Sequence, residues 1–339
     1  MSVRMEQAEL LAVVERVLWA QRDRAGVAWD IADVTAEDVT RASRWLVSAE
    51  QLGLGAFGVS MLIREIDRLG ASPAGEQTVY VGDSSADATV TIDAARIPGP
   101  IALAVAVRRL LAASVDTASR AIRAVSIENV GALGILGLAA RDVAEQGLLA
   151  LLCARAPAMV APWGGNHAAI GTNPLALAAP RRDRAPLVLD YATSPISMAA
   201  LKAAASAGEQ LDAPGGFTAE GARTTDATEV ATIAPDSRIA SLTGLAVELL
   251  TRSTTAQRPE PTSSTRSALL IAIDPHSFGA ASFPDSVADL AAGWAAAGGH
   301  VPRRFDEGTT TTAVEIDEAL VQTLRGYADE GATADRSEP

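Results

Sequence analysis

The feature that most constrains the fold is an alternation of helix-like and strand-like segments through the middle of the chain. Helical patterns at about 101–119, 135–146 and 195–207 alternate with apolar, strand-like segments at 121–127, 148–154 and 187–190. Such alternation predicts an α/β fold, in which helices cover a sheet. A loop rich in Pro, Gly and Asn interrupts the pattern at 156–174.

Helices are expected at both ends of the chain. Thr35 offers an N-cap, with acidic residues in the turn that follows it, and most of the first 70 residues read as helical. Short β-branched segments at 78–81 and 88–92 predict a hairpin. Helical patterns at 284–298 and 314–326 close the sequence.

These patterns divide the chain into four parts. Residues 1–72 form a helical N-terminal segment, and 73–283 form an α/β core domain with a ligand cleft. Residues 284–328 are C-terminal helices that pack back on the core, and 329–339 are a frayed tail. The polar stretch at 251–267 is interpreted as a surface loop rather than a domain boundary.

Composition excludes several classes of function. The net charge of −13 repels nucleic acids and anionic membrane surfaces, so neither is an expected partner. With one cysteine, Cys153, the chain forms no internal disulfide and no cysteine-based zinc site, and no metal is expected. Lys202 is the single lysine, so Schiff-base chemistry has one candidate. The sequence shows neither a secretion signal nor an apolar stretch long enough to span a bilayer, which predicts a cytoplasmic protein.

Two glycine patterns are candidate ligand-binding loops. The segment 53–58 matches G-x-G-x-x-G, but a helix precedes it where the dinucleotide motif needs a strand, so it is interpreted as a turn between helices. Gly131, Gly134 and Gly137 recur every third residue between a strand and a helix. That spacing favours close backbone packing, with an anion at the helix N-terminus as the alternative.

The densest group of functional candidates lies in 161–174 and just beyond it. The loop carries a Trp-Gly-Gly turn, His167 and an Asn-Pro pair, a combination that stability alone does not explain. Asp190 ends an apolar strand and is followed by Thr193 and Ser194 at the start of a helix. In α/β proteins ligands bind at this kind of strand end.

Three motifs resemble the malate/L-lactate dehydrogenase family, which also contains ureidoglycolate dehydrogenases and cyclic imino-acid reductases. They are Pro-Trp-Gly-Gly (162–165), Gly-Thr-Asn-Pro-Leu-Ala (171–176) and Leu-Asp-Tyr-Ala-Thr-Ser (189–194), with weaker matches at 224–226, 247–250 and 272–278. The resemblance implies a non-Rossmann mixed sheet with helical flanking N- and C-terminal segments, and a homodimer. If the chain is a redox enzyme, it also implies NAD(P) bound by Gly134, Gly171, Asn173, Thr224 and Asp226.

The sequence departs from the family where the family keeps its acid/base residues. The family's Ser-His-Gly-Val motif corresponds to Ala-Phe-Gly-Val (56–59), so Phe57 stands where the histidine would be, and Met61 replaces a substrate-binding arginine. The segments 131–134 and 237–240 likewise lack a family histidine and a His-Lys pair. A phenyl ring cannot transfer the proton that accompanies hydride transfer.

The remaining polar residues supply the candidate site. Asp190 is the expected general base, since burial at a cleft would raise its pKa. His167 is a second catalytic candidate, and Arg64 is a substitute for the lost arginine. The predicted substrate-binding residues are Phe57, Arg64, Thr172, Asn173, Thr193 and Ser194.

We expect from these departures a repurposed enzyme without a cofactor. It would catalyse elimination or closure of a small nitrogen ring, such as an aziridine, on an amino- or hydroxy-acid-like substrate, free or bound to a carrier protein. The arginine-rich, lysine-poor composition resembles high-GC actinobacterial proteins, which suggests specialised metabolism. The alternatives are an NAD(P)-dependent oxidoreductase of 2-hydroxy, 2-oxo or imino acids, and a non-catalytic subunit of a small protein partner.

Overall fold

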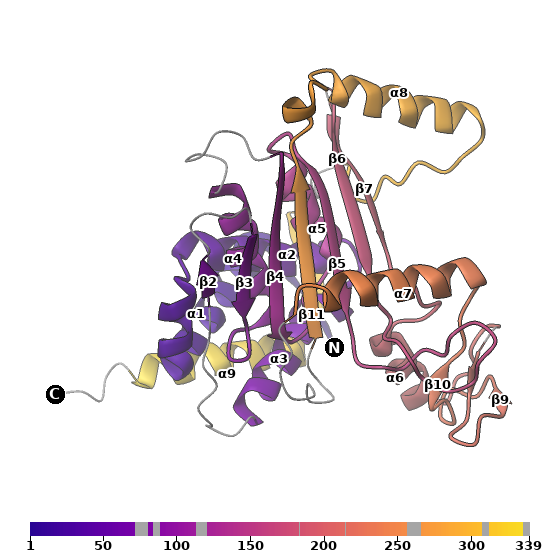
Figure 1. Ribbon diagram of the computed structural model, residues 1–339. Helices are drawn as coiled ribbons and strands as arrows, with labels where there is room; N and C mark the ends of the chain where they lie inside the picture. Colours follow the sequence, from indigo (N-terminus) through magenta and orange to yellow (C-terminus); the bar gives the residue numbers. More distant parts are fainter. Residues whose placement is uncertain are drawn as a thin grey trace.

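A seven-stranded sheet is the centre of the fold (Figure 1). The computed structural model describes residues 1–71, 81–83, 89–112, 121–182, 184–213, 215–255, 266–306 and 312–334. The strands, in spatial order, are β2 (Val81–Asp83), β3 (Thr89–Asp93), β4 (Ile122–Val130), β11 (Arg266–Ile273), β5 (Leu149–Arg155), β6 (Leu175–Arg181) and β7 (Arg184–Tyr191). Within the described residues β3 and β4 pair in parallel and the other neighbours are antiparallel. The predicted mixed α/β sheet is confirmed.

Two apolar helices cover one face of this sheet. They are α4 (Gly99–Ala112) and α5 (Leu136–Ala144), and both bury most of their residues. Their alanines and glycines let the helix backbones approach the sheet closely. Gly99, the first residue of α4, is one such close contact, since a Cβ there would lie 2.1 Å from the carbonyl oxygen of Ala132, just after β4.

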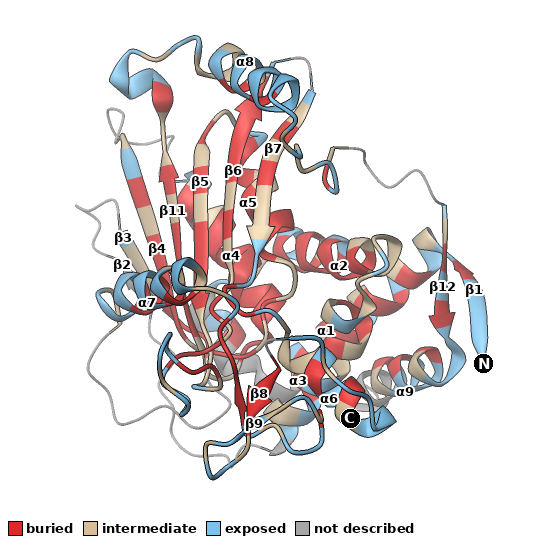
Figure 2. Cartoon of the chain, turned by 90° about the vertical axis from the view of Figure 1, so that its right-hand side faces the viewer, coloured by how far each residue is buried: buried red, intermediate tan, exposed pale blue. Residues whose placement is uncertain are grey.

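The opposite face of the sheet is only partly covered. Helix α7 (Arg238–Arg252) packs on β5 and β11, and α8 (Phe283–Ala296) packs on β6. Both helices expose much of their surface in Figure 2. Between them, a row of half-buried apolar side chains crosses four adjacent strands: Ile271, Leu151, Leu177 and Leu189.

The N- and C-terminal segments form a second layer beside α4. Helix α1 (Gln7–Ala32) packs on α9 (Glu318–Ala334), and α2 (Ala36–Gln51) packs on α4. The remaining helix of this layer is α3 (Val59–Ala71). The predicted cap at Thr35 is confirmed as a capping box with Asp38. Within the described part of the chain, no helix is both long and apolar enough to cross a membrane.

Several sequence predictions need correction. Residues expected at the start of the last helix form β12 (Ala313–Asp317), which pairs with the unpredicted β1 (Ser2–Glu6) at the other end of the chain. Helix α9 continues to Ala334, so the expected frayed tail begins as helix; residues 335–339 lie outside the described part.

The predicted hairpin was right in its pairing, because β2 and β3 are antiparallel neighbours. Residues 78–80 and 88 of that prediction lie outside the described part. The polar region 208–236, for which the sequence predicted no strand, contains a three-stranded sheet of β8 (Gly216–Phe217), β9 (Arg223–Thr224) and β10 (Thr232–Ile233). With α6 (Met198–Ala207) this small sheet surrounds its own apolar cluster, which includes Val160 and Ile233.

We predict that Gly99→Ala destabilises the protein by about 1–3 kcal/mol, because the added methyl group would overlap the Ala132 carbonyl in a packed region. Gly293→Ala is the matched control. Gly293 lies inside α8, and a Cβ added there would have no atom within 4 Å, so this change should stabilise the helix by about 0.5–1 kcal/mol. Urea unfolding of both variants measures the difference, and equal stability of the two would contradict the close approach.

Candidate functional site

The N-terminus of α5 is bound by the carboxylate of Asp190. Strand register places Asp190 beside Ala176, on the face of the sheet that α5 covers. Its Oδ2 accepts a hydrogen bond of 2.9 Å from the backbone N–H of Gly137, in the first turn of the helix. Amide groups at a helix N-terminus lack partners within the helix and favour negative charge. An anion at this helix N-terminus was the alternative interpretation of the glycine spacing, and that anion is the Asp190 carboxylate of the protein itself.

Asp190 is enclosed by residues from two other elements. A Cβ added at Gly137 would lie 2.8 Å from both Asp190 Oδ2 and Cζ of Phe305, so the helix, the carboxylate and the phenyl ring meet without spare room. Burial raises the pKa of the Asp190 carboxyl, while the Gly137 N–H and the positive charge of Arg304 oppose that rise. The described residues donate no hydrogen bond to Oδ1 of Asp190.

Phe57 and Met61 lie on the other side of the same glycine-rich turn. Phe57 ends a short 3-10 helix (Gly55–Phe57), and Met61 is in the first turn of α3. The Cβ position of Gly134, which has φ +88°, lies 3.5 Å from the Phe57 carbonyl oxygen and 3.6 Å from Cε of Met61. The structure therefore brings Phe57, Met61 and Gly134 together.

Arg64 is held away from this contact. It is exposed on α3 and donates hydrogen bonds to the carbonyl oxygen of Ala56 (2.9 Å) and to Oγ of Ser60 (3.3 Å). These bonds stabilise the turn that carries Phe57. The predicted turn between helices at Gly53 is also present, with φ +69°.

Asn173 and Thr193 join the central loop to α7. Asn173 is fully buried, and its Nδ2 donates to the carbonyl of Gly244 and to Oε1 of Glu248, both at 3.0 Å. Thr193 donates through both its backbone N–H and its hydroxyl to the carbonyl of Thr172. A Cβ at Gly244 would lie 3.0 Å from Oγ1 of Thr193, so the helix rests directly on this loop.

The other loop residues are bound locally. Ser194 is buried and donates its hydroxyl to the carbonyl of Ile196 (2.8 Å). A Cβ at Gly171 would lie 2.4 Å from the carbonyl oxygen of Ala156, which indicates close backbone packing. Thr224 and Asp226 lie on and after β9, where Thr224 Oγ1 accepts from the Asp226 N–H at 3.1 Å.

His167 is exposed beside the small sheet. Its ring lies 3.5 Å from the Cβ position of Gly221, and the neighbouring Asn166 donates to the Gly221 carbonyl. Within the described residues, no hydrogen bond or ion pair joins His167 to Asp190. Nor do these residues contain a group of three or more His, Cys, Asp and Glu side chains placed to hold a metal ion.

A cavity of about 500 Å³ opens beside this histidine. Its lining combines aromatic rings, a guanidinium group and flexible glycines: Trp163, Gly164, Gly165, Asn166, Phe217, Gly221, Arg223 and Pro235. Arg223 stacks over the Phe217 ring, 4.8 Å from its centre, and Trp163 is 57% exposed. Aromatic faces and a guanidinium group are the side chains that bind a base and a phosphate. The residues present therefore fit a nucleotide cofactor.

The N-terminal half of α7 connects this cavity to the Asp190 region. The Trp163 N–H donates to Oγ of Ser241 at 2.9 Å, and Gly244, one turn further along the helix, contacts Thr193. Thr193 follows Asp190 by three residues. The cavity and the α5 N-terminus thus belong to one continuous framework of packed residues.

Arg304 and Phe305 are site residues that the sequence did not predict. They follow α8 in a segment without regular structure, which packs on the body of the protein through Phe305 and through an ion pair of 2.6 Å between Arg181 and Asp306. Nothing in the local sequence pattern separates these residues from surface loop residues. Their contact with a strand more than 100 residues earlier in the chain appears only in the folded structure.

Comparison with known proteins supports the motif resemblance. The malate/L-lactate dehydrogenase family model matches residues 25–303. A (2R)-3-sulfolactate dehydrogenase (NADP(+)) from Chromohalobacter salexigens is 30% identical over 96% of this chain and 98% of its own. A Delta(1)-pyrroline-2-carboxylate/Delta(1)-piperideine-2-carboxylate reductase from Pseudomonas putida is 32% identical over 66% of this chain and 62% of its own.

Solved structures show the same fold. The delta1-piperideine-2-carboxylate reductase of Pseudomonas syringae pv. tomato superposes with a TM-score of 0.75 at 21% identity, covering 96% of this chain and 99% of that one. A dehydrogenase from Sinorhizobium meliloti superposes with a TM-score of 0.73 at 24% identity, covering 97% and 98%.

These relatives overturn the expectation of a non-redox cyclising enzyme without a cofactor. They are named dehydrogenases and reductases, and one is named for its NADP(+), which favours the oxidoreductase alternative. The inference from Phe57, Met61 and the other departures was wrong because the loss of family motif residues does not by itself identify a change of reaction. From the family model, the nearly full-length relative and the shared fold, we conclude that the chain belongs to the malate/L-lactate dehydrogenase family.

Proposed function

We propose that the protein is an NAD(P)-dependent oxidoreductase of small 2-hydroxy and 2-oxo acids or cyclic imino acids. The observation that carries this proposal is the framework that joins a nucleotide-sized cavity to Asp190 through α7. The names of relatives that act on sulfolactate, malate and pyrroline-2-carboxylate support the substrate class.

The cofactor is assigned to the cavity beside the small sheet. Trp163 would contact the base, Arg223 would bind phosphate oxygens, and the glycines at 164 and 165 would let the backbone approach. The nicotinamide, when bound, supplies or accepts the hydride. Thr224 and Asp226, predicted as cofactor ligands, lie on and just after β9, the strand that carries Arg223.

Asp190 is our candidate for the proton transfer. Phe57 has no ionisable group, whereas Asp190 has a carboxyl whose pKa is raised by burial and whose Oδ1 has no hydrogen-bond donor among the described residues. A raised pKa brings a carboxyl closer to the range where it both takes and gives a proton. Arg304, whose charge acts on Asp190, is the candidate to bind the substrate carboxylate in place of the arginine lost at Met61.

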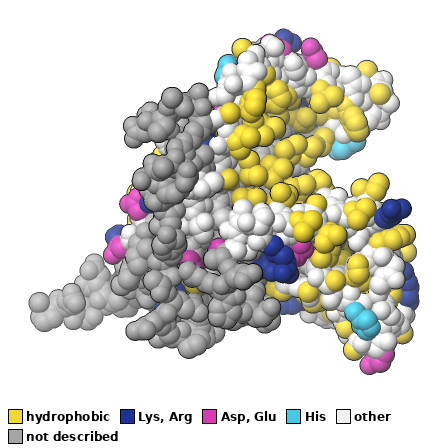
Figure 3. All heavy atoms as spheres, viewed as in Figure 1, with side chains coloured by type: hydrophobic (Ala, Val, Ile, Leu, Met, Phe, Trp, Pro, Cys, Tyr) yellow, Lys and Arg dark blue, Asp and Glu magenta, His cyan; other side chains and the backbone are white. Residues whose placement is uncertain are grey.

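A homodimer is the proposed quaternary state. Hydrophobic side chains gather over the strands between α7 and α8 (Figure 3), where the row from Ile271 to Leu189 crosses the sheet. The helices add exposed apolar side chains on both sides of this row: Ile239, Leu242, Leu245 and Leu249 on α7, with Leu290 and Trp294 on α8. An apolar surface of this extent is typical of an interface rather than of a free surface.

Binding of the cofactor should quench the fluorescence of Trp163. We expect NADPH or NADH to bind with a Kd of roughly 1–100 μM, in the range usual for such ligands. Trp163→Phe should remove most of the quenching, while Trp294→Phe, which changes a tryptophan of similar exposure on α8, should retain it. Failure of both nucleotides to bind in calorimetry would contradict the proposed function.

Replacement of Asp190 should remove a pH-dependent step. Asp190→Asn keeps an acceptor for the Gly137 N–H, so the fold should persist while kcat falls about 10²–10⁴-fold. In the wild type, oxidation of the substrate needs the ionised Asp190 carboxyl, so this activity should be lost as pH falls through the raised pKa of Asp190. Reduction of the substrate needs the protonated carboxyl, so that activity should be lost as pH rises through the same pKa.

The pH profiles of kcat/KM in both directions test this assignment. Asp212→Asn, at an exposed position between α6 and β8, is the control and should leave both profiles unchanged. Full activity of Asp190→Asn with an unaltered profile would assign the proton transfer to another group, such as His167 or a water molecule.

The apolar surface between α7 and α8 predicts that the protein is a dimer in solution. Light scattering should give twice the chain mass of 34.9 kDa. The double change Leu245→Glu and Leu249→Glu places two charges on the exposed face of α7 and should yield monomers. Gln322→Glu, on the exposed face of α9, should leave the dimer intact. A wild-type chain that stays monomeric at high concentration would refute the proposal.

A further inference from the structure

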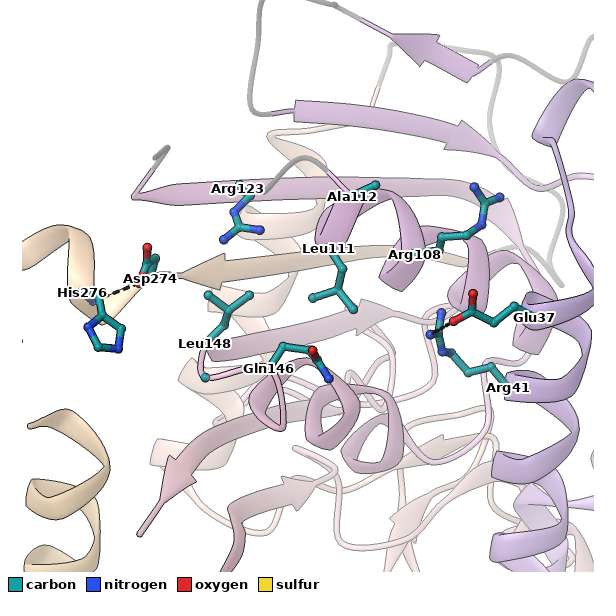
Figure 4. Close-up of a pocket in the computed structure, with 11 residues that line it drawn as sticks. Glu37, Arg41, Arg108, Leu111, Ala112, Arg123, Gln146, Leu148, Asp274 and His276 are labelled. Carbon is teal, nitrogen blue, oxygen red and sulfur yellow. Dashed lines mark hydrogen bonds and ion pairs between the residues drawn. The ribbon is translucent and has the colours of Figure 1, made fainter. Parts of the chain in front are cut away.

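A cavity of about 620 Å³ lies at the C-terminal end of α5, whereas Asp190 binds the N-terminus of that helix. It is bordered by the start of β4, the residues after β11, the C-terminal ends of α4 and α5, and the first turns of α2 (Figure 4). Three strands of the sheet separate β4 from β7, and neither Asp190 nor Gly137 lines the cavity, so this cavity is separate from the site built around Asp190.

Arg123 contributes a buried guanidinium group at one end of the cavity. The residue is 5% exposed, and its Nη1 donates to the carbonyl of Leu110 at 3.1 Å. Its Nε is buried and has no hydrogen-bond partner in the described part of the chain. Asp274 and His276, which line the same end, bond to each other through the His276 N–H and Asp274 Oδ1.

Arg41 contributes a second guanidinium group at the opposite end (Figure 4). Its Nη2 donates to Oε1 of Glu37 at 2.6 Å. Its Nε and Nη1 are buried without a hydrogen bond to any described residue; Nε lies 3.6 Å from Oδ2 of Asp142, beyond hydrogen-bond range.

Arg108 lines the same cavity, but all three of its guanidinium nitrogens have hydrogen-bond acceptors. Its Nε donates to both carboxylate oxygens of Asp38, at 2.9 and 3.1 Å, and its other nitrogens bond to Asp33. The two unsatisfied arginines therefore differ from their neighbour in needing an acceptor from outside the described chain.

The lining indicates what that acceptor is. Buried N–H groups without partners are rare because each loses its hydration on folding. Water could accept these hydrogen bonds, but carboxylate and phosphate oxygens form stronger, charge-assisted bonds with a guanidinium group. Leu111 and Leu148 line the space between the two guanidinium groups and favour an apolar segment there.

We propose that this cavity binds a small organic dianion of the dicarboxylate class, with one acidic group held by Arg123 and the other by Arg41. Of the three arginines that line the cavity, Arg108 is already bonded to Asp38, so Arg41 and Arg123 are the two with N–H donors left for a ligand. Because the cavity is separate from the Asp190 site, the ligand would act as an effector or stabiliser and not as the substrate.

Saturated dicarboxylates test the proposal, since they carry no hydroxyl, oxo or imino group to react. Calorimetry and thermal unfolding would compare malonate, succinate, glutarate and adipate with butyrate and inorganic phosphate. We expect one chain length to bind best and to raise Tm, and butyrate and phosphate to bind more than about tenfold more weakly.

Variants locate the binding. Arg123→Gln and Arg41→Gln should each weaken the best dicarboxylate about tenfold or more, and the corresponding lysine variants should weaken it less because they keep the charge. The control is Arg325→Gln, which breaks an exposed ion pair between Arg325 on α9 and Glu9 on α1. Asp190→Asn should also leave dicarboxylate binding intact. Circular dichroism would confirm that each variant folds.

Three outcomes would overturn the proposal. One is that no dicarboxylate binds below about 10 mM. The second is that butyrate binds as tightly as the best dicarboxylate, which would exclude a two-ended site. The third is that binding survives the changes at Arg41 and Arg123 but is lost in Asp190→Asn, which would assign it to the site of the proposed oxidoreductase function.

Discussion

The structure depends on close backbone packing around the turn that precedes α5. Three glycines lie where a side chain would collide with a neighbour: Gly99 against the Ala132 carbonyl, Gly131 against the Glu65 carboxylate and Gly137 against Asp190. Because these contacts join α4, α3 and β7 to one short segment, they fix the relative positions of the helical layer and the sheet. The candidate site is built on this segment, so the packing that stabilises the fold also positions Asp190.

The oxidoreductase function that we propose requires residues other than those of the family motif. Phe57 occupies the turn where the family motif has a histidine, and it contacts Gly134 through its backbone. In our proposal Asp190 is the acid/base group, and the positive charge of Arg304 acts on it. The carboxylate would then have two roles, since the Oδ2 atom that binds the helix N-terminus leaves Oδ1 available for a proton.

The sequence predicted some elements well and others poorly, for identifiable reasons. Segments with clear periodicity, such as α5 and β5, were predicted close to their observed bounds. Strand β6 was missed because its alanines and proline are poor strand formers, and it is held between β5 and β7 by pairing alone. Strand β12 was taken for helix because its partner, β1, lies at the opposite end of the chain.

The sequence by itself determined the fold class and family, because periodicity and the loop motifs are local properties of the chain. It also singled out Asp190 and the spacing of Gly131, Gly134 and Gly137. Only the tertiary structure decided that Asp190 binds the first turn of α5, that Asn173 anchors α7, and that Arg41 and Arg123 share a cavity. Hydrogen bonds and burial depend on contacts between residues far apart in sequence, and these contacts form when the chain folds.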